Sequence, residues 1–249
     1  MKLESIATIM DFDPYSQRTE AGATHNIGEG VTLADQRKFR YAVAGEALTL
    51  GYLSCAPTPV TALHTMAVLV GAIGSQTITF TNGATTAIDT LAETVYFSEG
   101  YVCVSYGTGI GQTWKINTLD PVATGASGTI HLYDVIGTAL STTSKIDIVQ
   151  NTYNGVLEGI LVGSLPAGVP LKSITAAGDF GWLQTRGVCA LASDDTIAAA
   201  TDIVADGDDS GKIDGISETI GTTVAQHKVG KTIVAGADTY SHAVFLMIE

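Results

Sequence analysis

The segment AQHKVGKT, residues 225–232, carries the residue types of a phosphate-binding loop, with a small residue, four variable residues and then Gly-Lys-Thr. A working phosphate loop joins a buried strand to a helix, and the amide groups at the helix N-terminus hold the phosphates. Thr232 is instead followed by Ile233 and Val234, which are typical of a strand, and no helical pattern comes after them. We therefore expect no nucleotide site, and we expect Lys231 to be a solvated charge in a loop at a strand edge.

A second glycine-rich stretch, GTGIGQTWKI at residues 107–116, has glycines spaced like those of a dinucleotide-binding fingerprint. That fingerprint requires a strand before the glycines and a helix that begins at them. Strand-like runs lie on both sides here, so the stretch predicts a glycine-rich turn between two strands.

The acidic stretch DGDDSGKIDGIS, residues 206–217, follows the calcium-binding loop of an EF-hand over much of its length. The candidate ligands are Asp206, Asp208, Ser210 and Asp214. The stretch departs from the pattern at its last position, where Ser217 stands and the carboxylate of Glu218 falls one residue late. Two interpretations stay open: a structural calcium ion that makes the loop rigid, or an acidic, solvated hairpin. We expect no other cofactor.

No local arrangement of nucleophile, base or metal ligands indicates an active site. The chain has neither an HExxH motif nor a GxSxG motif, and its histidines form no pair at metal spacing. The three cysteines are far apart and form no CxxC pair, so we expect buried thiols rather than a disulfide or a zinc site. We predict no catalytic residues and no enzymatic activity.

The charge balance of the chain is strongly acidic, with 25 acidic and 12 basic residues and a formal net charge of -13. Such a surface repels phosphate backbones, so we expect no nucleic-acid partner. The N-terminal residues 1–15 carry charge where a signal peptide has its apolar core, and the uncharged residues 47–88 are broken by prolines and glycines. We expect a soluble protein made in the cytoplasm, with no membrane partner.

Short runs of β-branched and aromatic residues, bounded by Gly, Asn, Asp and Pro, dominate the chain. Residues 76–88, QTITFTNGATTAI, alternate apolar and polar side chains and then reach Asn82-Gly83, a hairpin signal. Residues 32–45 fit either a helix or a strand, and we favour a strand because Phe39, Tyr41 and Val43 then share one face. The spacing of the runs predicts an all-β chain built from sandwiches or barrels.

We expect three parts. Residues 1–40 are polar and predict an extended N-terminal arm. Residues 41–71 and 153–249 predict a small β-barrel-like domain, and residues 72–152 predict a Thr/Gly-rich β module, a sandwich or barrel, inserted into that domain.

Several segments resemble virion proteins encoded among the head genes of tailed bacteriophages. The segments are GVTLADQRKFRYAVAGEALTLGYLSCAP at 30–57, STTSKIDIVQNTYNGVL at 141–157, GWLQTRGVCALA at 181–192 and SHAVFLMI at 241–248. The resemblance implies a capsid decoration (cement) protein that binds the outer surface of the phage head. It further implies a homotrimer with the major capsid protein as partner and the virion as location. Residues 1–40 would then contact the shell or a neighbouring subunit.

Other classes of protein stay open as alternatives. A tail, fibre or receptor-binding module fits the Thr/Gly-rich strands, although no fibre-like repeat is visible. The major capsid protein itself would need a long spine helix, for which there is no periodic stretch. A depolymerase would need a constellation of carboxylates or a nucleophile. A carbohydrate-binding platform would need exposed aromatic side chains on one face, whereas Trp114 and Trp182 are typical of core or interface anchors.

Overall fold

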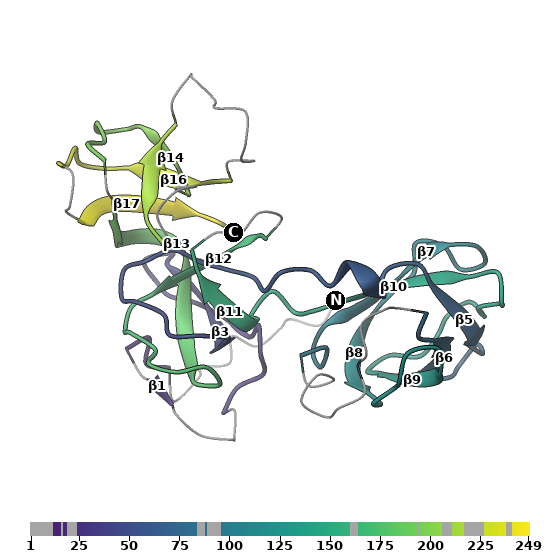
Figure 1. Cartoon of the computed structure of the whole chain (residues 1–249). Helices are drawn as coiled ribbons and strands as arrows, with labels where there is room; N and C mark the ends of the chain where they lie inside the picture. Colours follow the sequence, from purple (N-terminus) through teal and green to yellow (C-terminus); the bar gives the residue numbers. More distant parts are fainter. Residues whose placement is uncertain are drawn as a thin grey trace. The chain divides into compact units, whose positions relative to one another are not determined.

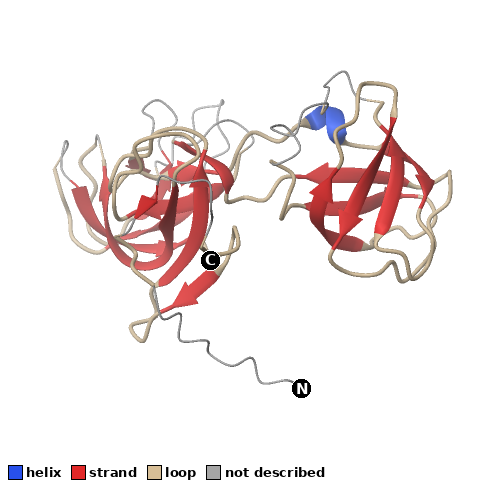
Figure 2. Cartoon of the chain, turned by 90° about the horizontal axis from the view of Figure 1, so that it is seen from below, coloured by secondary structure: helices blue, strands red, loops and turns tan. Residues whose placement is uncertain are grey.

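The computed structural model shows a chain of short, mostly antiparallel β-strands (Figures 1 and 2). It describes residues 12–15, 17–18, 24–83, 88, 96–159, 164–193, 195–205, 211–216, 227–237 and 241–249. Among these residues the one helical segment is a single 3-10 turn, η1 at Thr61–Leu63. The prediction of an all-β chain with a barrel-like domain and an inserted β module is therefore confirmed.

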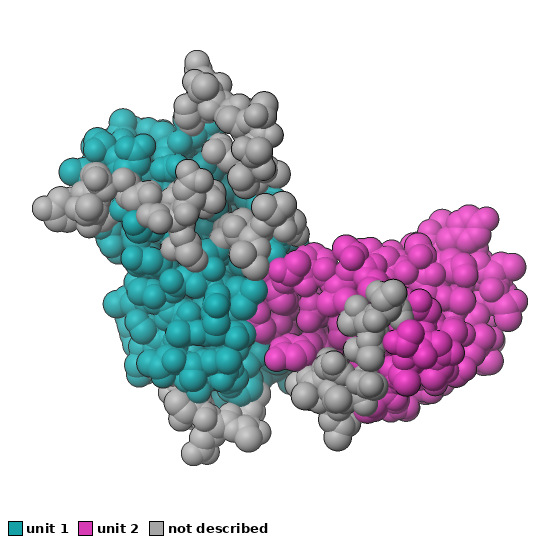
Figure 3. All heavy atoms as spheres, in the orientation of Figure 1, with its two compact units in different colours: residues 1–55, 156–249 teal, residues 56–155 magenta. Residues whose placement is uncertain are grey.

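The chain forms two compact units, each with its own hydrophobic core (Figure 3). Unit 1 contains residues 1–55 and 156–249, and unit 2 contains residues 56–155 between them. Unit 2 begins earlier than residue 72, where the sequence places its start. The reason is that β5 (Met66–Val70) pairs with strands of unit 2 on both sides.

Unit 2 is a closed barrel of antiparallel strands in the order β10-β5-β6-β9-β8-β7. The remaining strands are β6 (Thr77–Thr81), β7 (Tyr101–Tyr106), β8 (Thr113–Leu119), β9 (Ser127–Leu132) and β10 (Lys145–Val149). Side chains alternate across the barrel wall, so that Ile78 and Phe80 are fully buried while the threonines between them are half-buried. Inward side chains such as these fill a barrel of this size completely.

The Asn82-Gly83 signal follows directly after the end of β6 at Thr81. β6 pairs with β5 and β9. Most residues between Gly83 and Tyr96 lie outside the described part of the chain, so a hairpin at Asn82-Gly83 stays a prediction.

Unit 1 contains a ring of five strands and a sheet that continues from it. The ring consists of β3 (Lys38–Ala44), β4 (Ser54–Cys55), β11 (Asn154–Glu158), β12 (Pro166–Pro170) and β13 (Phe180–Ala192). The continuing sheet consists of β17 (Ser241–Met247), β16 (Lys228–Thr232), β14 (Asp202–Ala205) and β15 (Ile213–Gly215). Of the predicted strand at residues 32–45, β3 confirms residues 38–44, whereas residues 33–37 form the turn that joins β2 (Gly30–Thr32) to β3.

The long strand β13 belongs to both parts of unit 1 (Figure 1). Its first half pairs with β3 and its second half with β17, and the change of partner occurs at Arg186, which faces Lys38 on β3 and Met247 on β17. Gly187 follows with a φ of 93°, a conformation that favours glycine. An ion pair of 2.8 Å between Arg40 Nε and Glu249 Oε1 ties β3 to the end of the chain beyond β17.

Strands β4 and β11 pair antiparallel, with Cys55 opposite Leu157 and Ser54 opposite Glu158. The chain between these paired residues is the whole of unit 2. The barrel thus occupies the position of the turn in a β-hairpin of unit 1.

The described part of residues 1–40 packs on unit 1. β2 (Gly30–Thr32) pairs with β3, and β1 (Gln17–Arg18) pairs with the start of β13. The Phe12 ring lies 5.1 Å from the ring of Phe39 and 4.9 Å from that of Trp182, and it packs against a buried aromatic cluster. This part of the expected arm is therefore anchored by an aromatic side chain and a two-residue strand.

Candidate functional site

The predicted calcium loop lies largely outside the described residues. Asp206, Asp208 and Ser210 fall there, whereas Asp214 lies in β15 opposite Val204. The described residues contain no group of three or more His, Cys, Asp or Glu that could hold a metal ion. Calcium binding stays a prediction.

The Gly-Lys-Thr pattern lies inside β16, which is paired on both sides with β14 and β17. The expectation of a loop at a strand edge was therefore wrong. Gly230 is required by packing, because a Cβ there would overlap the carbonyl oxygen of Phe245. Thr232 Oγ1 donates a hydrogen bond of 2.6 Å to the carbonyl of Ala198. These residues hold strands together rather than forming a phosphate cradle.

Lys231 has an exposed side chain, as expected of a solvated charge, and it also forms an ion pair. Its Nζ lies 2.7 Å from Asp202 Oδ1, and Lys228 Nζ lies 2.9 Å from Asp202 Oδ2. Hydrogen bonds from Lys231 and Lys228 hold the pKa of the Asp202 carboxyl below its usual value. The three side chains link β14 to β16 at the surface.

The second glycine-rich stretch forms the predicted turn between β7 and β8. Gly107, Gly109 and Gly111 have φ values of 80°, 83° and 88°. Such values favour glycine, which explains the spacing without a dinucleotide.

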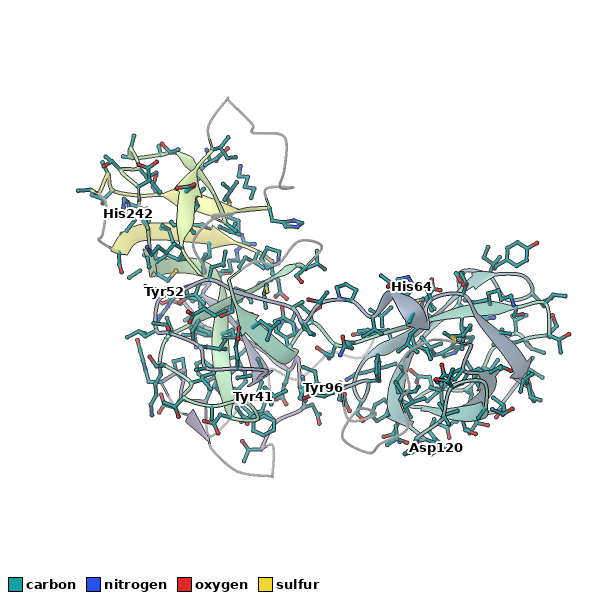
Figure 4. All side chains as sticks on the ribbon, in the orientation of Figure 1. Tyr41, Tyr52, His64, Tyr96, Asp120 and His242 are labelled. Atoms are coloured by element: carbon teal, nitrogen blue, oxygen red, sulfur yellow. The ribbon has the colours of Figure 1, made fainter. Side chains whose placement is uncertain are left out.

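Two of the described histidines lie beside carboxylates and a third is buried. His131 Nε2 lies 3.2 Å from Asp120 Oδ1 at the surface, and His25 Nδ1 lies 3.5 Å from Glu29 Oε1. His242, labelled on β17 in Figure 4, is buried, and neither of its ring nitrogens has a hydrogen-bond partner among the described residues. These pairings resemble no nucleophile–base arrangement.

Cys55 and Cys189 are buried, and Cys103 is half-buried. Burial raises the pKa of the Cys189 thiol to about 12, so it stays protonated and unreactive at neutral pH. Trp114 and Trp182 are buried as expected of core anchors, and Trp114 Nε1 donates a 3.3 Å hydrogen bond to the carbonyl of Val135.

Three connections of the barrel lie at one end, because neighbouring strands are antiparallel. We call them together the barrel cap: residues 71–76, 107–112 and 133–144. Main-chain hydrogen bonds join 71–76 to 133–144, with Gly74 N donating to Ile136 O at 2.8 Å. The side chain of Gln112 joins 107–112 to 133–144, since its Oε1 accepts from Thr138 N at 3.0 Å. The chain enters and leaves the barrel at the opposite end.

The barrel cap presents large apolar side chains to solvent. Ile73 is 68% exposed and Ile110 is 66% exposed, and Val135 is also exposed. Val70 and Tyr106 are exposed at the adjoining strand ends. The cap contains one charged residue, Asp134, in a chain with a net charge of -13. Exposed apolar side chains held on hydrogen-bonded loops are typical of a contact surface.

A second feature lies on the outer wall of the barrel. The Tyr133 hydroxyl donates a hydrogen bond to one oxygen of Glu99, and Lys115 Nζ contacts the other. Lys115 Nζ also lies 5.4 Å from the centre of the Tyr133 ring, within cation–π range. The hydrogen bond to Glu99, with smaller effects of burial and of the negative charge, raises the pKa of Tyr133 to about 12.

Sequence reasoning missed both the cap and this cluster. A signal for the cluster was present, because Tyr133 stands at an outward position beside the inward-facing Leu132. Which outward residues of separate strands become neighbours depends on the order of strands in the barrel, and that order is not a local property of the sequence.

No helix in the described part of the chain has the length and apolarity needed to cross a membrane. Comparisons with models of known families, with curated proteins and with solved structures find no match.

Proposed function

We propose that the chain is a virion structural protein of a tailed bacteriophage that decorates the outer surface of the head as a homotrimer. The observation that carries the proposal is the barrel cap, a nearly uncharged surface with exposed Ile73 and Ile110. The resemblance of residues 30–57, 141–157, 181–192 and 241–248 to head-gene proteins supports it. In this proposal the partner is the major capsid protein, and the barrel cap is the surface that contacts it.

The distribution of charge is consistent with attachment through the cap. Unit 2 has six acidic residues and two lysines among 100 residues, whereas unit 1 has the remaining 19 acidic and 10 basic residues. Like-charge repulsion opposes close contact between acidic surfaces, so association is least costly where charge is scarce. The acidic balance also favours the outer side of a shell over the side that faces packaged DNA.

A trimer would strengthen a weak contact at each cap. Three caps on one particle-bound trimer act together, because the second and third contacts form at a high effective concentration. A modest apolar surface on each copy is then sufficient for stable decoration.

The first test is the native mass of the purified chain by light scattering on a sizing column. We expect a discrete species near three times 25.7 kDa. Megadalton shells would support the major capsid protein instead, and a monomer would contradict the trimer.

The second test is binding to phage heads that lack the protein, followed by sedimentation and electron microscopy. We expect Ile73→Asp and Ile110→Asp to reduce head binding at least tenfold, since each places a charge in the apolar contact. Val234→Asp is the matched control, because Val234 is similarly exposed (59%) but lies in unit 1. Equal binding by all three variants would refute attachment through the cap.

A further inference from the structure

Four outward-facing residues form a row across neighbouring strands of the barrel. Tyr101 on β7 stands opposite Val149 on β10 and opposite Lys115 on β8. Tyr133, just beyond β9, continues the row, because its amide donates a hydrogen bond of 3.2 Å to the carbonyl of Lys115. We call Val149, Tyr101, Lys115 and Tyr133 the tyrosine row. Its two tyrosines are two strands apart, about 10 Å along the sheet.

The tyrosine row leaves aromatic surface in water. Tyr101 is 43% exposed and Tyr133 is 45% exposed. Tyrosine has few rotatable bonds, so a ligand that stacks on it loses little side-chain entropy. Tyr133 is held further by its hydrogen bond to Glu99 and by the ammonium of Lys115.

Glu99 itself is held in an unusual conformation. Its φ is 65°, in the left-handed region that non-glycine residues seldom adopt. Two contacts fix it: Glu99 N donates to Ile116 O at 3.0 Å, and Asn151 Nδ2 donates to Glu99 O at 2.9 Å. Strained residues that the surroundings hold in place are common at binding sites. The carboxylate is therefore held at Tyr133 and Lys115 before any ligand arrives.

The chemistry of the row selects among possible ligands. The charges of Glu99 and Lys115 cancel, yet the ammonium has three N–H donors and the carboxylate has several acceptor positions. Aromatic faces beside such hydrogen-bond donors and acceptors suit a ligand whose rings have an apolar face and carry many hydroxyl groups. A nucleic acid also stacks on aromatic rings, but it requires a basic groove, and unit 2 has only two lysines against six acidic residues.

We propose that the tyrosine row is a binding site for a neutral oligosaccharide. The apolar faces of two sugar rings stack on Tyr101 and Tyr133, while hydroxyls bond to Lys115 and Glu99 between them. Tyr133 is the first residue of the barrel cap, but the site uses none of Ile73, Ile110 and Val135, the exposed aliphatic residues of the cap. Substitutions at those residues can therefore test attachment to heads separately from glycan binding.

The test uses the full-length protein on an array of neutral and acidic glycans, followed by calorimetry with the strongest neutral oligosaccharide. We expect binding to neutral glycans that is insensitive to salt. Tyr101→Ala and Tyr133→Ala should each weaken it by roughly tenfold, because each removes one stacking face. Tyr106→Ala, on a more exposed tyrosine (65%) at the end of β7, should leave the affinity unchanged.

Thermal unfolding shows whether a tyrosine substitution weakens binding by removing the aromatic ring or by disrupting the fold. Tyr101→Ala removes an exposed side chain, so its melting temperature should match that of the natural chain. If no neutral glycan binds, if only acidic glycans bind, or if Tyr106→Ala weakens binding equally, the proposal is overturned. Self-association that Tyr101→Ala abolishes would instead identify the row as a protein interface. Loss of head binding by the cap variants with intact glycan binding would show that the two surfaces act separately.

Discussion

At the scale of single residues, the pair of Tyr133 and Glu99 connects electrostatics to stability. The phenol keeps its proton because Glu99 accepts it in a hydrogen bond and because a second negative charge beside the carboxylate is unfavourable. The raised pKa of Tyr133 means that the folded state binds this proton more tightly than the unfolded state. The contribution to stability is therefore complete below about pH 10 and is lost as the pH rises toward 12.

This pair gives a prediction for alkaline titration. In the natural chain, the absorbance change of Tyr133, obtained by subtracting the titration of Tyr133→Phe, should have its midpoint near pH 12. In Glu99→Gln the same difference should move toward pH 10, because the charge and the charged acceptor are gone. An unchanged midpoint in Glu99→Gln would show that the carboxylate does not control the phenol.

At the scale of elements, the pairing of β16 explains the Gly-Lys-Thr sequence that resembles part of a phosphate-binding loop. Gly230 permits β17 to approach, and Thr232 and Lys231 bond to residues before and within β14. We expect Gly230→Ala to lower the free energy of unfolding by about 1–3 kcal/mol, because the new Cβ forces two paired strands apart. Denaturant unfolding measures the change.

Gly83→Ala is the control for this substitution. A Cβ at Gly83 would meet no atom within 4 Å, so we expect a change of at most about 0.5 kcal/mol. If Gly230→Ala and Gly83→Ala lowered the free energy of unfolding equally, the close approach of β17 to Gly230 would not be the cause of the destabilisation.

The strands also show why only part of the fold could be predicted from the sequence. Period-two alternation predicted β6 and β7, because one face of each strand is buried. In β3 the alternation breaks, since the adjacent Tyr41 and Ala42 are both buried and Val43 is half-buried. It could not place β5 in unit 2 or pair β6 with β9, since strand partners come from distant parts of the chain. The tyrosine row was hidden for the same reason, as its members come from four separate segments.

At the scale of the whole molecule, unit 2 has all the features of an independent folding domain. Its strands pair with one another in a closed barrel, and its core contains side chains such as Phe80 and Ile130. We expect the isolated fragment 56–155 to unfold in one cooperative transition when monitored by near-ultraviolet circular dichroism. Phe80→Ala should destabilise the fragment and the barrel of the full chain by a similar amount, about 3–5 kcal/mol. A fragment without a cooperative transition would contradict this independence.

The pairing of β4 with β11 has a genetic consequence. Cys55 and Leu157 face each other on adjacent strands, so a turn of a few residues would reconnect unit 1 if the barrel were absent. Hairpin turns tolerate insertions better than the strands they join. An insertion or deletion at this one point of the coding sequence would therefore add or remove the entire barrel and leave the strand partners of unit 1 the same.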